Sequence, residues 1–493
     1  MTAPTCSAFT IKFCLYTLLC KPWASLYCPP APPASVDIAI IGGGLAGLTT
    51  AHELLSAGHS VLVLEARKTI GGKVQNRELK NGGIAEVGAE FVGPTQDKIL
   101  DLIDELGLQT FDTYDEGKYV FWRKGVRTEY EKHWLVDAMP PVSWFSVLQM
   151  GFVQVLLDTM AGKLNVSAPW SHPKAPYWDS MSFEEWLHGW IWSADAMFMM
   201  ECVARSVWGA EARELSLLYV LSYIAGAGNE MLKGSVDRLL SVKGGGQEKR
   251  VVGGTGLIPI RLAERVGWGN IMTGAVVYKV TEIDGRYEIQ WGGGSVRADK
   301  VVLALGPTLV KRITFSPDLP DNRKRLNEGW TMGAMSKAIA AYSTPFWRHP
   351  SRNLNAQAFT DRGAVGVTFD NSPEDGSFGA IMGFFDGDQA RRVETMSPSA
   401  VQAEVLEDLV RYFGEEARNA TDFVMQRWGL EEHIWGGPNA VAPPGMLGRY
   451  GESMREVVGG IHFAGAETNA YWAGYMDGAV RSGMRVAREI LDS

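Results

Sequence analysis

Cysteine is scarce in the body of this chain. Only Cys202 lies after residue 35, and the other four cysteines precede the first segment with strand character: Cys6, Cys14, Cys20 and Cys28. A single cysteine cannot form an internal disulfide, and no Cys-x-x-Cys pair or Cys/His cluster has the spacing of metal ligands. The body of the chain is therefore predicted to fold without disulfides, and no metal site is expected.

Positive charge and long apolar runs are also limited. The sequence has 47 Lys and Arg against 56 Asp and Glu, a net charge of −9, and it contains no basic run. This balance argues against nucleic acid or an anionic membrane surface as the partner. Beyond the leader, no segment is read as approaching the roughly 20 apolar residues of a membrane span, so no transmembrane anchor is expected. Only eight histidines are present, and no Ser/His/Asp set or carboxylate pair stands out.

Residues 1–35 form a separate leader. Lys12 precedes a short apolar stretch, residues 13–20, which ends at Lys21 and is followed by a proline-rich spacer, residues 28–33. The interpretations left open are a weak secretory signal within residues 1–28, a disordered leader, or a start that has been assigned too early. The chain is accordingly either cytoplasmic or secreted, and its compartment is unknown from the sequence.

The most informative stretch is residues 36–67. An apolar run leads to Gly42, Gly44 and Gly47 in G-x-G-x-x-G spacing, an Ala/Leu-rich segment follows, and a second apolar run ends at Glu65. Gly42 permits a tight turn, Gly44 lets a pyrophosphate approach the backbone, and Gly47 lets the helix pack closely on the strand. With strand, helix and acid in this order, the stretch predicts a dinucleotide site; the alternative is a merely structural βαβ turn.

Two further properties of this stretch describe the ligand. The start of the helix presents unpaired N–H groups and a positive dipole end to phosphates. The Glu65 carboxylate can accept hydrogen bonds from ribose hydroxyls, and its negative charge disfavours a 2′-phosphate. The predicted ligand is therefore a dinucleotide with free ribose hydroxyls.

The rest of the chain is long enough for two or three domains. Residues 110–243 are rich in Trp, Met and Phe with helical periodicity, including a predicted capping box of Ser182 and Glu185 and a buried helix over residues 215–224. Strand character returns after residue 244, and residues 301–305 predict a central strand. A second excursion over residues 322–413 predicts strands near 335–342 and 379–385 and a helix near 398–413.

A second junction of strand and helix lies near the end of the chain. Residues 460–465 predict a strand, and apolar positions from Met476 onward recur at helical spacing in a helix that opens near Trp472. In one sheet, the two junctions would supply two helix N-termini, one for a pyrophosphate and one for a ring that carries negative charge.

Five motifs in this order resemble the flavin-containing amine oxidases, the monoamine and polyamine oxidase group. They are IGGGLAGL with LEAR and IGGK, then VGAEFVGPTQ, GGGQEKRVVGGTG, SKAIAAYSTPFWR and FAGAETNAYWAGYMDGAVRSG. The resemblance covers residues 36–491. It implies an α/β (α+β) fold of two domains, similar to p-hydroxybenzoate hydroxylase: a Rossmann-like FAD domain assembled from residues 36–109, 244–320 and 421–493, and a mixed sheet and helix substrate domain from residues 110–243 and 321–420.

The resemblance also implies a role for individual residues. Those expected to hold FAD are Gly42, Gly44, Gly47, Glu65, Arg67, Gly72, Lys73, Val276, Glu467, Tyr475 and Met476. Those expected at the reaction centre are Lys337, which would bridge through a water to flavin N5, Trp428 and Tyr475. Those expected to contact substrate are Gln247, Trp435, Pro438 and Tyr475.

Three departures from the family pattern refine these expectations. Residues 435–439 contain no cysteine, so FAD is expected to be non-covalent. Pro438 stands where one of two cage tyrosines is usual, which leaves Tyr475 without its partner unless Trp435 or Tyr471 contributes. Lys73 replaces an arginine, with the loss of bidentate recognition.

The implied reaction is oxidation of an amine. A hydride equivalent passes from the α-carbon to flavin N5, giving an imine, and O2 is reduced to H2O2. The open cage suits a bulky or secondary amine of a specialised pathway. Two alternatives are kept: a flavin desaturase or oxidocyclase that acts on a C–C bond, and a non-catalytic protein that binds FAD for structure. The expected partners are a small-molecule amine and O2, with homodimer formation left open.

Overall fold

The computed structural model describes residues 33–131 and 140–493. The leader predictions for residues 1–35 therefore fall almost entirely outside the described residues. Pro33–Ser493 forms one compact unit, and its division into an FAD domain and a substrate domain stays a prediction.

An eight-stranded sheet carries the glycine motif. Its order is β13-β10-β11-β12-β1-β2-β9, and β21 also pairs with β12. The strands are β1 (Ser35–Ile41), β2 (Val61–Glu65), β9 (Ile271–Thr273), β10 (Val277–Ile283), β11 (Arg286–Trp291), β12 (Gly294–Ala304), β13 (Thr314–Ser316) and β21 (Ile461–Ala464). β1 runs parallel to β2 and β12, with Ile40 opposite Val63 and Val302. β12 also pairs in parallel with β21, which confirms the predicted central strand for residues 301–304; the strand ends one residue earlier than predicted.

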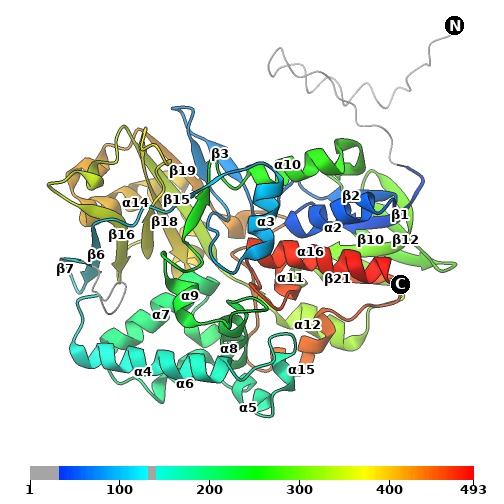
Figure 1. The fold of residues 1–493 in the computed structure, drawn as a ribbon, viewed down its shortest axis with the longest axis horizontal. Helices are drawn as coiled ribbons and strands as arrows, with labels where there is room; N and C mark the ends of the chain where they lie inside the picture. The colour runs from blue at the N-terminus through cyan, green and yellow to red at the C-terminus, as the bar shows by residue number, and fades with distance from the viewer. Residues whose placement is uncertain (1–32, 132–139) are drawn as a thin grey trace, which may run out of the picture. The chain divides into compact units, whose positions relative to one another are not determined.

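Both faces of these parallel strands are covered, as their continuous apolar sequences require. On one face lie α2 (Leu45–Ser56), α3 (Asp97–Glu105), α10 (Leu257–Val266) and α16 (Met476–Leu491). α2 and α16 pack side by side (Figure 1), and they touch so closely that a Cβ at Gly483 would lie 2.6 Å from the Ala46 carbonyl oxygen. The opposite face packs against the apolar side chains of β10 and β11.

A seven-stranded sheet forms a second layer. Its order is β19-β15-β18-β17-β16-β6-β7. The strands are β6 (Lys118–Arg123), β7 (Val126–Tyr130), β15 (Met335–Tyr342), β16 (Leu354–Thr360), β17 (Val367–Asp370), β18 (Gly379–Asp386) and β19 (Asp422–Gln426). Apolar residues of α13 (Gly387–Glu394) and α14 (Pro398–Phe413) join the core on this sheet. The sheet lies at the left of Figure 1, and the helical layer described next lies below it.

The helical layer is built around α8 (Leu217–Gly226), whose apolar side chains are buried on all sides. Its other helices are α4 (Trp144–Ala161), α5 (Ala175–Asp179), α6 (Phe183–His188), α7 (Ala194–Trp208) and α9 (Val236–Leu240). The capping box predicted for α6 is confirmed: Glu185 N donates to Ser182 Oγ at 3.1 Å, and Ser182 N donates to Glu185 Oε2 at 2.8 Å.

Short elements connect the layers. They are the strand pairs β3 (Asn76–Glu78) with β4 (Ile84–Glu86), β5 (Thr110–Asp112) with β8 (Lys249–Val251), and β14 (Thr331–Met332) with β20 (Ala440–Val441), and the helices α11 (Pro307–Val310), α12 (Asp321–Gly329) and α15 (Leu447–Tyr450).

One predicted strand is divided in the structure. Residues 271–280 form β9 and β10 rather than a continuous strand, because Gly274 adopts a φ of 72°. The N–H groups of Gly274 and Ala275 donate to the carbonyl oxygens of Arg67 and Glu65. The chain therefore bends beside the end of β2, which carries Glu65.

α4 corrects the expectation that no body segment approaches a membrane span. This helix has 18 residues and a mean hydropathy of 1.2, and among the described residues it alone is long and apolar enough to cross a membrane. The sequence interpretation missed it because Ser146, Gln149 and Gln154 interrupt the apolar run. Its inner side packs against the core through Val153 and Leu157.

Candidate active site

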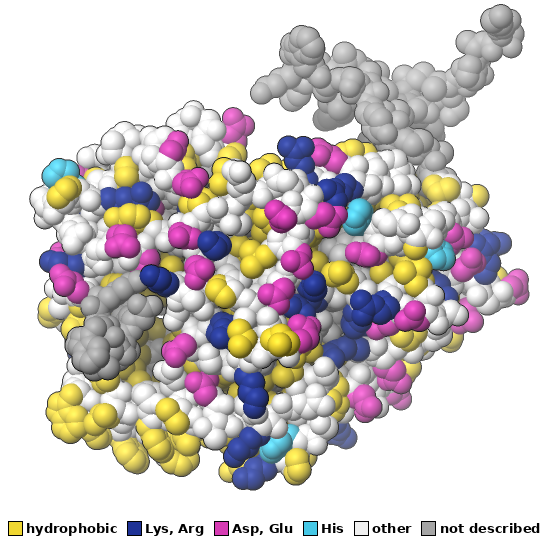
Figure 2. Space-filling view, in the orientation of Figure 1, with side chains coloured by type: hydrophobic (Ala, Val, Ile, Leu, Met, Phe, Trp, Pro, Cys, Tyr) yellow, Lys and Arg dark blue, Asp and Glu magenta, His cyan; other side chains and the backbone are white. Residues whose placement is uncertain are grey.

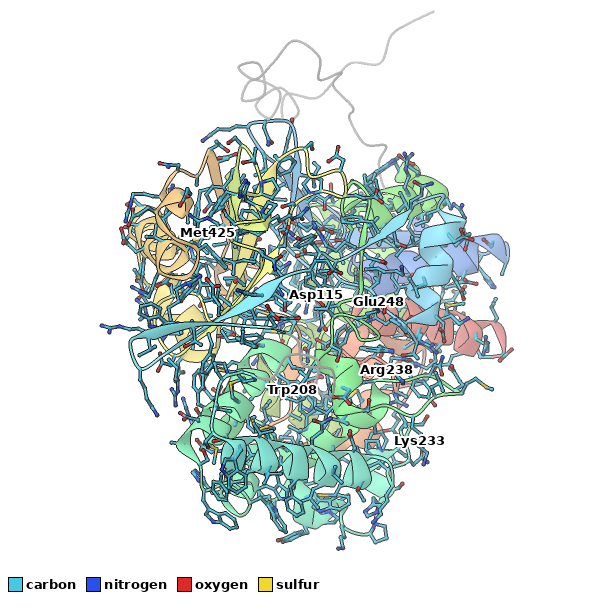
Figure 3. The ribbon with its side chains drawn as sticks, turned by 60° about the vertical axis from the view of Figure 1, so that its left-hand side comes forward. Asp115, Trp208, Lys233, Arg238, Glu248 and Met425 are labelled. Carbon is cyan, nitrogen blue, oxygen red and sulfur yellow. The ribbon has the colours of Figure 1, made fainter. Side chains whose placement is uncertain are left out.

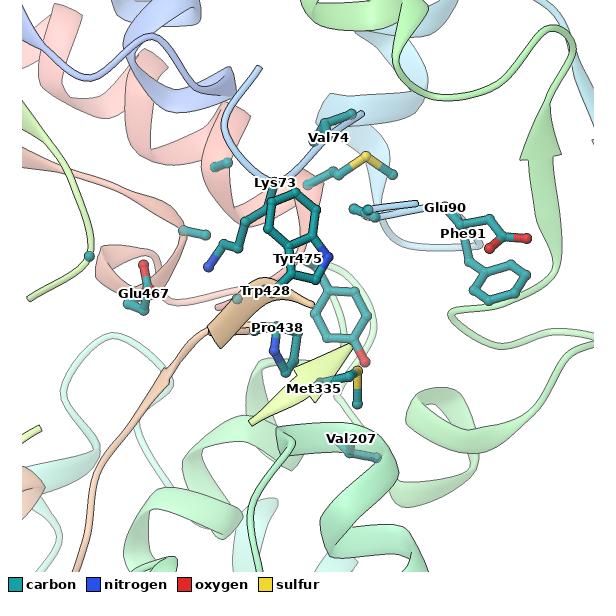
Figure 4. A pocket seen from close by; sticks show the side chains of 18 of the residues that line it. Lys73, Val74, Glu90, Phe91, Val207, Met335, Trp428, Pro438, Glu467 and Tyr475 are labelled. Atoms are coloured by element: carbon teal, nitrogen blue, oxygen red, sulfur yellow. The ribbon is translucent and has the colours of Figure 1, made fainter. Parts of the chain in front are cut away.

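A cavity of about 1420 Å³ lies at the carboxyl ends of β1, β2, β12 and β21 and extends between the second sheet and the helical layer. Ligands of open α/β sheets bind at this edge. The volume exceeds the roughly 300–1,000 Å³ of a pocket for one small ligand, so the cavity has room for a dinucleotide and a second molecule. Figure 4 shows Glu467 and Glu90 on opposite sides of the group formed by Trp428, Tyr475 and Pro438.

The three glycines of the motif have different surroundings. Gly42 has a φ of 110°, and a Cβ there would lie 2.6 Å from the Ala304 carbonyl oxygen. A Cβ at Gly47 would lie 2.0 Å from the Gly42 carbonyl oxygen, whereas one at Gly44 would meet only the Gly72 Cα, at 4.0 Å. Gly42 and Gly44 line the cavity and Gly47 does not. Gly47 thus serves close packing, while Gly44 leaves space that faces the cavity.

Two helices begin at this cavity. The N-cap of α2 is Gly44 and that of α16 is Tyr475, and neither N-terminus is capped by a side chain. Leu45 of α2 and Met476 of α16 line the cavity. The first N–H groups of a helix have no partner within it and favour negative charge. The cavity therefore offers two positions that favour an anionic group.

Glu65 is fixed by the backbone at the end of β2. Its Oε2 accepts from Gly43 N at 2.7 Å and its Oε1 accepts from Arg67 N at 2.8 Å. Burial raises the pKa of Glu65, and these two N–H groups oppose the rise. Since each carboxylate oxygen has two acceptor sites, Glu65 retains capacity for ribose hydroxyls. The Arg67 guanidinium donates to the Gly72 carbonyl at 3.0 Å and pairs with Glu431 at 3.2 Å.

Lys73 and Glu467 also line the part of the cavity that includes the glycine motif and Glu65, which we call the nucleotide side. Burial lowers the pKa of Lys73, and the negative charge of Glu467 opposes this effect. Glu467 Oε1 accepts from Ala440 N at 3.0 Å, which holds the carboxylate in place. Val276, in the bend between β9 and β10, is 42% exposed at the rim of the cavity.

Trp428 and Tyr475 are held rigidly in the cavity wall. Trp428 Nε1 donates to the Val87 carbonyl at 3.0 Å, and Trp428 N donates to Ser336 Oγ at 3.0 Å. The Tyr475 ring packs edge-on against Trp472, with 4.8 Å between centroids. Trp428 is 4% exposed, so its position does not depend on a ligand.

Tyr223 supplies a second aromatic ring beside Tyr475. It comes from α8, its ring centroid lies 5.9 Å from that of Tyr475, and it lines the cavity. Burial raises the pKa of both phenols. The sequence offered no signal for Tyr223, which lies in an apolar helix like other core aromatics.

The two stand-ins considered for the missing cage tyrosine lie elsewhere. Trp435 stacks on the guanidinium of Arg312, whose Cζ is 4.1 Å from the ring centroid. Tyr471 lies beside Arg481, at 5.5 Å. Neither Trp435 nor Tyr471 lines the cavity, whereas Pro438 does. The structure therefore does not bring Trp435 together with the other predicted substrate residues.

Lys337 belongs to a buried network of four charges. Its Nζ lies 2.6 Å from Glu90 Oε2 and donates to the Glu86 carbonyl oxygen at 3.2 Å. Arg250 contacts Glu86 Oε2 at 2.7 Å and Glu90 Oε1 at 3.0 Å. All four side chains are at most 6% exposed. Two acids and two bases compensate one another, which explains how a lysine is tolerated here.

Gln247 and its neighbours line the part of the cavity away from the glycine motif. Gln247 Nε2 donates to the Leu239 carbonyl at 3.0 Å, while its buried Oε1 has no hydrogen-bond partner among the described residues. The lining of the cavity outside the nucleotide side is mostly apolar and includes Met199, Met200, Val203, Val207, Met335, Phe359, Val367, Phe369 and Phe384. We call this part the apolar arm.

Carboxylates are few in the apolar arm. Among the described lining residues, the acids are Glu65, Glu432 and Glu467 on the nucleotide side, Glu90 in the charge network, and Asp237. Asp237 accepts a hydrogen bond from Gln154 at 2.8 Å. In the part of the chain that the structure describes, no group of three or more His, Cys, Asp or Glu is placed to hold a metal ion.

Comparisons with known proteins agree on one family. The family model described as flavin containing amine oxidoreductase matches residues 45–491. A Mycobacterium tuberculosis protein whose name is putative flavin-containing monoamine oxidase AofH is 36% identical over 459 residues, which are 93% of this chain and 97% of that one. Flavin-containing amine oxidase A of Sus scrofa is 32% identical over 461 residues, 93% of this chain and 85% of the pig protein.

Solved structures of amine oxidases are also similar to this chain. A putrescine oxidase bound to putrescine superposes with a TM-score of 0.87 at 31% identity, over 94% of this chain and 100% of that chain. Cyclohexylamine oxidase from Brevibacterium oxydans gives a TM-score of 0.85 at 27% identity, over 93% of this chain and 99% of that chain.

Proposed function

The chain belongs to the flavin-containing amine oxidoreductases, and from this premise we propose that its substrate is a monoamine with a bulky apolar body. The family and its relatives establish FAD-dependent oxidation of an amine with O2 as acceptor. The observation that carries the proposal is the apolar arm, in which the buried carboxylate, Glu90, is already paired with Lys337 and Arg250.

The described residues fit FAD. Gly44 leaves the space that a pyrophosphate needs, the α2 N-terminus favours its charge, and Glu65 retains capacity for ribose hydroxyls. The α16 N-terminus and Lys73 lie where the ring end would be, with Trp428 as a wall. When bound, FAD supplies the two-electron acceptor that takes a hydride equivalent from the amine and passes electrons to O2.

FAD is held without a covalent bond. Residues 435–439 contain no cysteine, and Cys202 lies on α7, where burial raises the pKa of its thiol to about 12. A thiol is unreactive while it stays protonated. Acid precipitation of the purified protein is expected to release the yellow colour into the supernatant; colour retained in the pellet would contradict a non-covalent cofactor.

The protein acts on the amine by excluding water and fixing its orientation. An ammonium group is a poor hydride donor, and an apolar environment favours its neutral form. The rings of Tyr223 and Tyr475 would border the nitrogen-bearing end, and the apolar arm would take the rest of the molecule. Lys337 would be held beside the reaction centre by its ion pair with Glu90, whose Oε2 lies 2.6 Å from its Nζ.

A diamine fits this arm less well. A second ammonium would have to be buried, which requires a carboxylate partner or costs several kcal/mol. Glu90 is compensated, and Asp237 lies at the rim. We therefore expect discrimination against putrescine, the ligand in one of the similar structures.

Anaerobic mixing with a panel of amines tests this proposal. Cyclohexylamine and bulkier apolar monoamines should bleach the oxidised flavin absorbance at concentrations at least tenfold lower than putrescine does. If putrescine bleaches the flavin more readily, the assignment of substrate class is wrong. If no amine bleaches the flavin, the two alternatives that remain are a desaturase acting on a C–C bond and a non-catalytic FAD-binding protein. No observation on the described residues favours either.

A further inference from the structure

One face of α7 lines the apolar arm, and it carries a single hydroxyl group. The lining members on this helix are Met199, Met200, Cys202, Val203, Ser206 and Val207, positions that recur on one side of a helix. Ser206 is half-buried. A hydroxyl that faces an apolar cavity costs free energy unless it has a hydrogen-bond partner, so the bonding of Ser206 indicates what this part of the wall can recognise.

The end of α7 that carries Ser206 is fixed beside two cavity residues, Tyr223 and Pro438. Trp208, the last residue of the helix, packs edge-on against Tyr223, with ring centroids 5.4 Å apart. Figure 3 shows Trp208 in the interior, where the helical layer meets the rest of the protein. A Cβ at Gly209 would lie 3.1 Å from Pro438 Cδ. Ser206 is within one helical turn of these contacts.

Figure 4 shows where this wall lies relative to Tyr475. Val207, the neighbour of Ser206, and Met335 lie on the side of the pocket to which the Tyr475 hydroxyl points. Met335 is the first residue of β15, and it pairs with Asp386 at the end of β18. The α7 wall and the start of β15 thus border the same part of the arm, and a carboxyl group lies beside them.

The Ser206 hydroxyl is oriented by this carboxyl group. Ser206 Oγ donates to Asp386 Oδ2 at 3.5 Å. Charged side chains of both signs are spread over the face shown in Figure 2, whereas Asp386 is 2% exposed and does not line the cavity. The charged groups that face it are Arg205 and Glu211.

The protonation of Asp386 decides which part of Ser206 Oγ is left for a ligand. Burial raises the pKa of Asp386 to about 7, and the positive charge of Arg205 opposes the rise. Above that pH the group is a carboxylate, which only accepts hydrogen bonds. The proton of Ser206 is then directed to Asp386, and the lone pairs of its oxygen remain for a donor in the cavity.

We propose that Ser206 accepts a hydrogen bond from an O–H or N–H group on the body of the amine. The substrate is then an apolar monoamine with one hydrogen-bond donor at the position that meets α7. A site that pairs with such a donor also discriminates against an analogue without it. This inference rests on the proposed function, which it narrows from an apolar monoamine to one with a polar substituent.

Ring-substituted cyclohexylamines test the inference. Each aminocyclohexanol, with its hydroxyl on ring carbon two, three or four, is paired with the amine that carries a methyl group at the same position, because methyl is similar in size but cannot donate. The quantity measured at pH 9 is the ratio of kcat/KM for the hydroxyl over the methyl compound. For at least one position, this ratio should be about 2- to 12-fold higher in the unaltered protein than in Ser206→Ala, the range for one hydrogen bond.

A control and a second readout separate recognition from folding and turnover. Ser222→Ala is the control: Ser222 lies on α8, donates to the Tyr219 carbonyl at 2.8 Å and does not line the cavity, so this variant should keep the ratio of the unaltered protein. A ratio within one protein does not depend on the fraction that is folded. The rise in Tm caused by each compound in dithionite-reduced, FAD-saturated protein measures binding without turnover and should give the same order.

Two results would overturn the inference. Equal ratios in the unaltered protein and in Ser206→Ala would show that the hydroxyl only supports Asp386. A preference for the methyl ethers of the same alcohols that is lost in Ser206→Ala would show that Ser206 donates, since an ether cannot. Failure of the proposed function looks different: no amine, cyclohexylamine included, would then bleach the flavin, and the Tm measurement would still decide the role of Ser206.

Discussion

Substitution of Glu90 by glutamine tests the charge network that holds Lys337. The variant keeps the size and one acceptor oxygen of the side chain but removes a negative charge that lies 2.6 Å from Lys337 Nζ and 3.0 Å from Arg250 Nε. Glu86 is then left to compensate two buried cations. Removal of one partner from a buried ion pair costs about 3–5 kcal/mol, and the retained hydrogen bond returns about 1 kcal/mol. We therefore expect a loss of about 2–4 kcal/mol in the free energy of unfolding.

A double-mutant cycle isolates the interaction between the two side chains. Lys337→Met alone should cost less than Glu90→Gln, because Glu90 keeps Arg250 and the amide of Asn371. In the double variant, Glu86 and Arg250 again balance, so its loss should fall short of the sum of the single losses by at least about 1.5 kcal/mol.

Thermal unfolding of the FAD-saturated proteins at one scan rate measures the cycle. The control is Glu264→Gln, the same chemical change in the exposed Arg261–Glu264 pair, which should change stability by less than about 0.5 kcal/mol. Additive effects of Glu90→Gln and Lys337→Met, or a Glu90→Gln protein as stable as the unaltered one, would refute the compensated network.

Three further predictions concern four substitutions. Gly44→Val should fold with an unchanged circular dichroism spectrum but purify without yellow colour. Gly47→Ala should instead lower Tm, because its Cβ would lie 2.0 Å from a carbonyl oxygen. A yellow Gly44→Val protein would contradict this division of roles. Tyr223→Ala should raise the KM for the preferred amine about 2- to 12-fold, the equivalent of about 0.5–1.5 kcal/mol for an aromatic pair, and an unchanged KM would remove Tyr223 from the site. Burial raises the pKa of Asp386 to about 7, so the folded protein binds an extra proton below that pH, and its stability falls as the pH rises from about 4 to 7. Asp386→Asn should therefore stabilise the protein more at pH 8 than at pH 5, with a difference of about 2–3 kcal/mol in calorimetry. An equal gain at both pH values would disprove the assignment.

Elements with a strong local pattern were predicted well from sequence. β15 (Met335–Tyr342) and α14 (Pro398–Phe413) have the predicted bounds. β15 is apolar from Ala338 to Tyr342, and α14 is an amphipathic helix that begins after Ser397 with Pro398 at its first position. The last helix begins at Met476 rather than Trp472. Trp472 has a φ of 50°, a tertiary constraint that helical periodicity does not reveal.

The site was predictable where a motif fixes a backbone and not where distant side chains meet. The glycine turn is local, and Gly42, Gly44 and Glu65 lie together at the cavity. The pairing of Glu90 with Lys337 joins residues 247 positions apart, so neither periodicity nor spacing indicates it. Tyr223 likewise reaches Tyr475 only through the packing of α8 against the last strand-to-helix junction.

The distribution of charge in the cavity explains how one enclosed space can serve two unlike ligands. On the nucleotide side, the N-termini of α2 and α16 offer two positions that favour negative charge, which suits phosphates and a ring that gains negative charge. In the apolar arm, the Glu90 and Lys337 charges cancel, and burial raises the pKa of the phenols of Tyr223 and Tyr475 so that they stay neutral. Among the described residues of that arm, the buried carboxylate, Glu90, is already paired, and Asp237 lies at the exposed rim. We therefore expect the amine to lose its proton before or during binding. The pH dependence of binding should then follow the pKa of the substrate amine.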